Sequence, residues 1–211
     1  MNGEGKLTIG LILAGGQARR MGGADKAFVM LGGRTLVENA IERARSQAGE
    51  ILINANGDLS RFVKFGREIL PDRIGGFLGP LAGILTGHEW MKEHRPKARW
   101  LASIPCDTPF LPLDMVERLI GEAERVHALT AVASSGGRRH NVCAVWSASI
   151  AETASTVLNE RGLRKMDDFI DSLPHVEVAF DAGPVDPFFN INTADDLARA
   201  GDLMAKTQAL R

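Results

Sequence analysis

The chain has 211 residues, enough for one medium domain with an ample core, and its 25 basic and 26 acidic residues nearly cancel. A chain this close to neutral has no broad charged surface for coating DNA or an anionic membrane, so neither nucleic acid nor membrane is an expected partner. Any anionic ligand must then be held by local cations and backbone N–H groups.

Cysteine usage and the N-terminal segment bear on where the protein works. Cys106 and Cys143 are far apart and match no metal-ligand spacing, which argues against a disulfide framework or a zinc site. Residues 1–8 lack the pattern of a signal peptide, and no stretch approaches the roughly 18 apolar residues of a membrane span. These features predict a cytoplasmic protein.

Short apolar runs alternate with helical patterns, starting with a buried strand over residues 9–13 that leads into glycines. Helical spacing follows over 36–44, where Thr35 and Glu38 form a capping-box signature. A second buried strand is predicted at 51–53. Gly79-Pro80 starts a helix that runs to about His94, with proline where a missing N–H costs nothing.

The second half continues the alternation. Strands are predicted at 100–104 and 129–134, with a helix over 112–126 between them, and Gly136-Gly137 marks a hairpin into a strand over 141–146. A helical face over 166–173 precedes a strand over 176–180, and Thr193 caps a final helix. With no internal repeat or linker, residues 1–211 are predicted to be a single α/β domain. Its sheet is mostly parallel, with helices on both faces and ligands at the carboxyl ends of the strands.

The first motif is a Gly-rich loop over residues 13–26, directly after the first strand. Four glycines allow the backbone to approach a bulky anion, and successive N–H groups can form a concave anion site. Arg19, Arg20 and Lys26 add the charge that a triphosphate, with about four negative charges, requires. The spacing fits neither a P-loop nor the dinucleotide fingerprint. The alternative is a flexible turn with solvated arginines, but strand, glycines and cations together favour phosphate binding.

Asp107 follows the strand at 100–104 and stands between Pro105 and Pro109. A single carboxylate at a strand end suits Mg²⁺, which keeps waters and takes other ligands from phosphates. From spacing alone, an Asx-turn or a helix-capping aspartate is an equal alternative. Asp72, on a loop before the Gly79-Pro80 helix, is by itself typical of a solvated loop acid.

Asn190 and Asn192 alternate with Ile191, which places the two amides on one face. They either read the polar edge of a ligand or cap the next helix. Asn54 and Asn56 pose the same choice after the second strand.

Other polar side chains carry weaker signals. Arg164 and Lys165 precede a helix, and a solvated basic turn is the simpler interpretation. The five histidines show no ligand spacing, so most are expected at the surface. Cys106 has no base beside it in sequence and is expected to be a buried spacer.

These motifs, in this order, resemble those of the molybdenum cofactor guanylyltransferases over nearly the whole chain. The matching segments are residues 13–16, 20–22, 25–26, 54–56, 79–83, 105–109 and 190–193. The resemblance implies a Rossmann-like nucleotidyltransferase fold. It also implies transfer of GMP from GTP to the terminal phosphate of molybdenum-molybdopterin, with release of pyrophosphate and with Mg²⁺ as the cofactor.

The resemblance also implies roles for individual residues. GTP would be contacted by Leu13, Ala14, Gly15, Lys26, Asn54, Asp72 and Asp107. Asp107 would bind Mg²⁺, and the catalytic set would be Arg20, Lys26 and Asp107. Molybdopterin would be received by Arg164, Lys165, Asn190 and Asn192. The His140-Asn141 pair departs from the His-Pro common in relatives and is not expected to form part of the site. Because the product is labile, molybdoenzyme apo-proteins and cofactor-insertion proteins are further expected partners.

Three alternatives fit part of the pattern. Cytidylyl transfer to the same cofactor is the nearest, but Gly16 favours the guanylyl branch because cytidylyl relatives tend to carry alanine there. A sugar- or alcohol-phosphate nucleotidyltransferase is disfavoured only weakly by the asparagines and by Arg164 and Lys165. A non-catalytic delivery protein that binds nucleotide and cofactor would not need Asp107 and Lys26.

Overall fold

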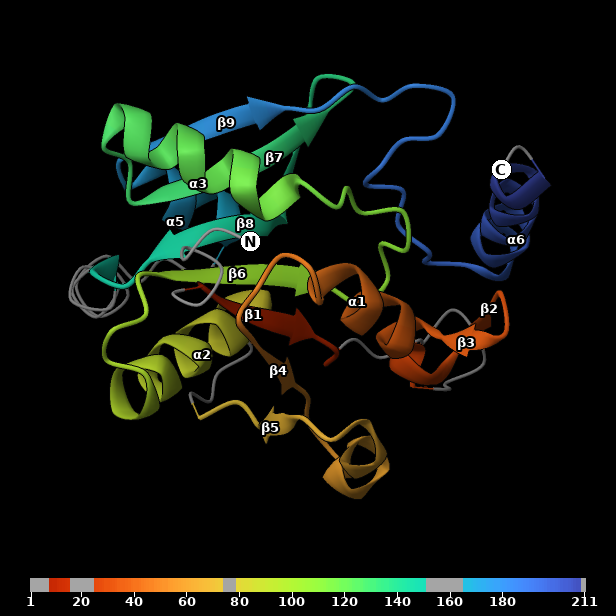
Figure 1. Ribbon diagram of the computed structural model, residues 1–211, viewed down its shortest axis with the longest axis horizontal. Helices are drawn as coiled ribbons and strands as arrows, with labels where there is room; N and C mark the ends of the chain where they lie inside the picture. The colour runs from red at the N-terminus through yellow and green to blue at the C-terminus, as the bar shows by residue number, and fades with distance from the viewer. Residues whose placement is uncertain (1–7, 16–24, 74–78, 151–164, 210–211) are drawn as a thin grey trace.

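A computed structural model of the chain describes residues 8–15, 25–73, 79–150 and 165–209. The strands of its main sheet are β1 (Thr8–Leu13), β4 (Glu50–Asn54), β5 (Glu68–Leu70), β6 (Trp100–Pro105), β7 (Thr130–Ser135), β8 (Arg138–Ser147) and β9 (His175–Ala179). They form a seven-stranded sheet in the order β5-β4-β1-β6-β8-β7-β9 (Figure 1). All neighbours pair in parallel except β8, which runs antiparallel to both β6 and β7. The predicted mostly parallel sheet, with one antiparallel hairpin, is confirmed.

Helices cover both faces of this sheet, as predicted. They are α1 (Leu36–Ala44), α2 (Pro80–His94), α3 (Met115–Val126) and α5 (Met166–Asp171). α1 and α3 contribute Val37 and Leu119 to one core cluster, whereas α2 and α5 contribute Ile84 and Phe169 to another. Two separate apolar clusters, one on each face, account for strands that are buried on both sides.

A smaller unit lies beyond the carboxyl ends of β1 and β6. It contains β2 (Met30–Leu31), β3 (Arg34–Thr35) and the C-terminal helix α6 (Ala194–Ala209). Leu31 and Ile191 share a third apolar cluster there, and Figure 1 shows α6 beside the β2–β3 hairpin, away from the main sheet.

Two predicted helix caps are confirmed by hydrogen bonds. At α1 the Glu38 N–H donates to Thr35 Oγ1 over 3.3 Å, and the Thr35 N–H donates to Glu38 Oε2 over 2.7 Å. At α6 the Asp196 N–H donates to Thr193 Oγ1 over 3.1 Å. Each cap satisfies backbone donors that the first helical turn leaves free.

Several predicted boundaries were wrong. The helix expected from residue 112 begins at Met115, because residues 112–114 form a turn closed by the Met115 N–H on Pro112 O. The predicted strand at 141–146 is only the centre of β8. The short strands β2, β3 and β5 and the 3-10 segments η3 (Lys26–Phe28) and η4 (Leu59–Phe65) had no counterpart in the prediction, because elements this short show no periodicity.

Burial separates the histidines. His88 is only 2% exposed, which contradicts a surface position for it, and burial lowers the pKa of its imidazole to about 3. Both of its ring nitrogens lack a hydrogen-bond partner among the described residues. Within the described ranges, no helix is both long enough and apolar enough to cross a membrane.

Candidate functional site

The predicted motifs meet at the carboxyl edge of the sheet. β1 and β6 are parallel neighbours, with Leu13 opposite Pro105, so the residues that follow the two strands leave the sheet side by side. The Cys106 N–H donates to Leu13 O over 3.2 Å, and the Ala14 N–H donates to Asn54 O over 2.8 Å. These bonds hold three successive strand ends together where open α/β sheets bind ligands.

Lys26 is the centre of the first polar cluster. Its Nζ lies 2.5 Å from Asp107 Oδ2, 2.8 Å from Asn192 Oδ1 and 3.4 Å from Asn190 Oδ1. The side chains of Lys26 and Asp107 are only 10% and 17% exposed. A nearly buried ammonium thus faces one carboxylate and two amide oxygens that come from distant parts of the chain.

Two local features orient these groups. Lys26 opens η3, whose N-cap Asp25 accepts from the Ala27 N–H over 3.3 Å. Ile191 is fully buried, and its N–H donates to Asp107 O over 3.0 Å. The asparagines on either side are exposed, so the predicted shared face is confirmed, although the segment is a loop and not a strand.

The loop that carries the asparagines is anchored on the β7–β8 hairpin. Asp186 Oδ1 accepts from Ser135 Oγ over 2.8 Å and from the Phe188 N–H over 2.9 Å. His140 Nε2 lies 2.8 Å from Ser135 Oγ, and its ring stacks on Phe188 with centroids 4.6 Å apart. His140 therefore supports the asparagine loop from behind. Sequence spacing carried no signal for this contact.

The second polar cluster gathers Asn54, Asn56 and Asp72. Asn54 Nδ2 donates to Asp72 Oδ1 and Asn56 Nδ2 to Asp72 Oδ2, each over 2.8 Å. The Asp72 N–H donates back to Asn56 Oδ1 over 3.0 Å. Asp72 is therefore a paired acid and not the solvated loop acid that it resembled in isolation.

Glycines bring backbone close to this second cluster. A Cβ added at Gly83 would overlap Asn54 Oδ1, and one at Gly15 would lie 3.4 Å from Asn56 Nδ2. The predicted motifs at 13–16, 54–56 and 79–83 therefore converge, as far as their residues are described.

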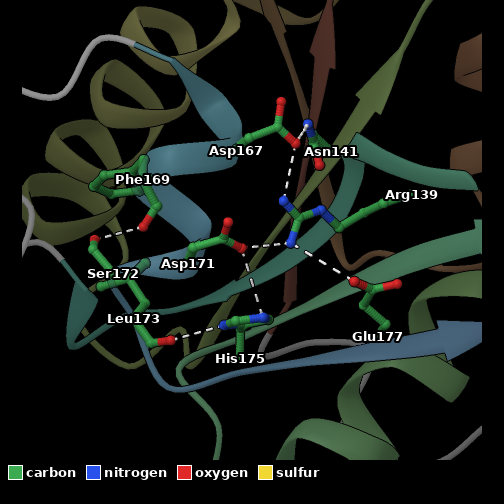
Figure 2. A network of polar contacts seen from close by, with 9 residues as sticks. All are labelled: Arg139, Asn141, Asp167, Phe169, Asp171, Ser172, Leu173, His175 and Glu177. Carbon is green, nitrogen blue, oxygen red and sulfur yellow. Dashed lines mark hydrogen bonds and ion pairs between the residues drawn. The ribbon is translucent and has the colours of Figure 1, made fainter.

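Lys165, predicted with the acceptor site, belongs to neither cluster. It is the N-cap of α5, and Figure 2 shows the side chains that tie α5 to the sheet. Arg139 on β8 reaches Asp167 Oδ1 over 2.9 Å and Asp171 Oδ1 over 2.6 Å, both on α5. Asn141 Nδ2 also donates to Asp167, over 2.7 Å. Arg20 and Arg164 lie outside the described residues.

The Arg139 network predicts a pH-dependent effect on stability. Hydrogen bonds from Arg139 lower the pKa of Asp167 and Asp171 below the ordinary 3.8. Carboxylates with a lowered pKa stabilise the fold above that ordinary value, and the gain is lost as the pH falls through the folded-state pKa. Arg139→Met should therefore lower the free energy of unfolding at pH 7 by about 1 kcal/mol, since the acids are well exposed.

Urea unfolding at pH 7 and at acid pH measures this effect. The difference between wild type and Arg139→Met should shrink as the pH falls below the ordinary carboxyl pKa of 3.8. Arg45→Met removes an exposed arginine that, among the described residues, pairs with Glu42 alone, at 3.6 Å, and it should change little at either pH. A difference that is the same at both pH values would contradict the role of the two aspartates.

Cys106 is confirmed as a buried spacer beside Asp107. It is 4% exposed, and burial, followed by the nearby Asp107 charge, raises the pKa of its thiol far above the ordinary value. A neutral buried thiol is neither a nucleophile nor a metal ligand under ordinary conditions.

The first cluster has the donor set of a magnesium site. Carboxylate and amide oxygens are hard ligands, and Asp107, Asn190 and Asn192 present them around one point. Over the described ranges, no group of three or more His, Cys, Asp and Glu residues could hold a metal by itself. A metal at Asp107 would therefore take its other ligands from the asparagine oxygens, from water or from a bound phosphate.

Known proteins with similar sequences are nucleotidyltransferases, which agrees with a phosphate-binding site at the edge of the sheet. Residues 10–176 match the family described as the MobA-like NTP transferase domain. A molybdenum cofactor guanylyltransferase of Rhodopseudomonas palustris (strain HaA2) is 46% identical over 193 residues, covering 92% of this chain and 90% of the relative. One from Bradyrhizobium sp. (strain ORS 278) is 43% identical over 196 residues, covering 93% and 92%.

Solved structures with the same fold include two nucleotide-related proteins. Molybdopterin-guanine dinucleotide biosynthesis protein A from Archaeoglobus fulgidus superposes with a TM-score of 0.73 at 23% identity, covering 94% of this chain and 99% of that one. CMP:2-keto-3-deoxy-manno-octonic acid synthetase, complexed with CTP, gives 0.69 at 14% identity, covering 95% and 99%. At these identities the likeness concerns the fold, which is the predicted Rossmann-like nucleotidyltransferase fold.

Proposed function

Because the chain belongs to the molybdenum cofactor guanylyltransferases, within the family of MobA-like NTP transferase domains, we propose that it transfers GMP from GTP to molybdenum-molybdopterin. The observation that carries the proposal is the contact of Lys26 with Asp107 and the two asparagines. This contact joins the cation of a proposed phosphate-binding loop to a carboxylate suited to Mg²⁺. We also propose that residues 1–211 form one domain.

The reaction exchanges one phosphoanhydride bond for another. A terminal phosphate oxygen of molybdopterin attacks the α-phosphorus of GTP in line, the bond to the β-phosphate breaks, and pyrophosphate leaves. The attacking phosphate is already anionic at pH 7, so no strong general base is needed. The difficulty is repulsion between anions, which Lys26 and Arg20 offset with positive charge.

Mg²⁺ is the proposed cofactor, with Asp107 as its anchor. When bound, it supplies charge neutralisation for the phosphates at the point where the leaving group forms. The nearly buried Asp107 carboxylate, 17% exposed, gives that interaction more strength than a solvated acid would.

The second cluster is the proposed nucleotide site. Leu13, Ala14 and Gly15 bring backbone to the nucleotide, and Asn54 and Asp72 hold it nearby. Each Asp72 oxygen accepts one amide N–H, which leaves lone pairs for the N–H groups of guanine. Cytosine has a ring-nitrogen acceptor on the same edge and would meet the carboxylate unfavourably, which favours GTP over CTP.

The acceptor side is proposed to use Arg164, Lys165, Asn190 and Asn192. The contact of the asparagines with Lys26 supports entry of the acceptor phosphate close to Asp107. A cytoplasmic location remains a prediction, as does transfer of the product to cofactor-insertion proteins or molybdoenzyme apo-proteins.

A panel of nucleotides with molybdenum-molybdopterin tests this function. Pyrophosphate release should be fastest with GTP, and excess CTP should compete poorly. Faster release with CTP would indicate a cytidylyltransferase. Release with sugar phosphates as acceptor would indicate a sugar-phosphate nucleotidyltransferase. Binding of GTP without any pyrophosphate release would indicate a delivery protein.

A further inference from the structure

The Lys26 ammonium lies among three side-chain oxygens that come from two distant parts of the chain. Asp107 Oδ2, Asn192 Oδ1 and Asn190 Oδ1 lie 2.5, 2.8 and 3.4 Å from Nζ. One carboxylate with neutral oxygens is also the donor set that a hard divalent cation prefers. The same oxygens therefore suit two different cations.

We propose that Lys26 and the catalytic divalent cation exclude each other from these three oxygens. On this view Lys26 closes the metal site until the triphosphate of the nucleotide draws its ammonium away. The inference rests on the proposed function, in which Lys26 binds phosphate and Asp107 binds Mg²⁺.

Charge is the first reason for exclusion. Asp107 is the one carboxylate in contact with Lys26 among the described residues, and both side chains are largely shielded from water. An ammonium and a divalent cation together bring three positive charges to that single carboxylate, with little screening between them. A triphosphate, with about four negative charges, compensates both cations once it is bound.

The mobility of the groups is the second reason. Lys26 carries its charge on a flexible four-carbon stem and can follow a phosphate, whereas the backbone that carries the three oxygens is tied down by hydrogen bonds. The Ile191 N–H bond to Asp107 O ties the asparagine loop to the Asp107 turn. Asp196 Oδ2 fixes the same loop by accepting from the N–H groups of Asn192 and Thr193, each over 2.9 Å. The backbone that presents the three oxygens thus keeps its place when the ammonium leaves.

The asparagines can serve cation and acceptor at once. Each points its Oδ1 toward Lys26, and neither Nδ2 group has an acceptor among the described residues. An amide offers one acceptor oxygen and two N–H donors, so the Nδ2 groups remain for the acceptor phosphate.

Exclusion makes metal and nucleotide binding mutually dependent. Metal alone must displace the ammonium from its ligands, whereas metal with nucleotide finds the ammonium already engaged. Such coupling raises each affinity by the same factor when the other ligand is present.

Mn²⁺ binding to the protein alone tests the inference, with free Mn²⁺ read by electron paramagnetic resonance and without nucleotide or molybdopterin. Lys26→Met should bind Mn²⁺ at least tenfold more tightly than wild type. Lys97→Met removes the same charge from an exposed position and should match wild type. The double variant Lys26→Met/Asp107→Asn should lose the gain.

Equal Mn²⁺ affinity of wild type and folded Lys26→Met would overturn the inference, as would a gain that Lys97→Met shares. Near-UV circular dichroism checks folding, and Lys26→Gln, which keeps a hydrogen-bond donor for Asp107, replaces the methionine variant if that one unfolds. No substrate is present, so failure here with intact GMP transfer removes the exclusion alone. If GMP transfer fails but the Mn²⁺ result is as expected, the proposed function is contradicted and the exclusion is not.

Discussion

Replacing Asp107 by asparagine is expected to slow turnover a few hundred-fold while the protein stays folded. The substitution removes the one carboxylate in contact with Lys26 among the described residues, and with it the proposed Mg²⁺ anchor. Loss of one stabiliser of transition-state charge typically costs about 3–4 kcal/mol. The asparagine oxygen can still accept from Lys26, so the ammonium is not left without a hydrogen bond.

Pyrophosphate release at saturating GTP and Mg²⁺ measures this loss, with thermal unfolding as the folding check. Asp114→Asn is the matched control, because that carboxylate is 58% exposed and lies 3.9 Å from Arg118 at the surface. It should leave turnover unchanged. Turnover near the wild-type rate in folded Asp107→Asn would contradict a catalytic role for this residue.

Replacing Gly83 by alanine is expected to raise the KM for GTP about tenfold or more, equivalent to about 1.4 kcal/mol of lost binding. The added Cβ would overlap Asn54 Oδ1 and lie 2.9 Å from Leu13 Cδ2. Asn54 is 5% exposed and also donates to Leu70 O over 3.0 Å, so it has little room to move. Any shift of Asn54 breaks its bond to Asp72, which is proposed to hold guanine.

Two glycines separate this effect from general helix packing. Gly87 lies one turn further along α2, and a Cβ there would lie 2.9 Å from Leu11 Cδ2 and 3.1 Å from Leu101 Cδ2, away from Asn54. Gly87→Ala should therefore cost stability without changing the KM for GTP. Gly121→Ala, with nothing within 4 Å of the added Cβ, should stabilise α3 by about 0.5–1 kcal/mol. A KM change in Gly87→Ala equal to that in Gly83→Ala would show that Asn54 is not the cause.

The main sheet was predictable because its central strands are apolar on both faces. Ile9, Leu11 and Ile12 in β1 are all buried, which gives a continuous apolar run instead of an alternating one. The short elements were not predictable, because two or three residues contain no period. The end of the 112–126 helix was predicted correctly and its start was not, since Pro112 suits a turn as well as a first helical position.

The site was predictable to the level of motifs but not of partners. Spacing places Lys26, Asp107 and the asparagines after predicted elements, and the rule for open sheets brings strand ends together. No sequence rule says that Lys26 faces Asn190 and Asn192, which lie 164 and 166 residues away. No sequence rule predicts the pairing of Asp72 with Asn54 either, because it depends on the path of the chain after β5 at the carboxyl edge of the sheet.

The support given by His140 was missed for a different reason. Asn141 departs from the family pattern, which argues against a site role for the pair, yet His140 contacts Ser135 and Phe188, and Asn141 bonds to Asp167.

We expect a nucleotidyl group to be transferred at the Lys26–Asp107 centre. The most direct measurement follows the label of GTP carrying ³²P at the α-phosphate, with Mg²⁺ and molybdenum-molybdopterin. The label should move into a product that contains both guanine and molybdopterin, unlabelled pyrophosphate should form in equal amount, and Asp107→Asn should suppress both. Label that stays in GTP, or that appears only as free GMP independently of molybdopterin, would contradict the claim.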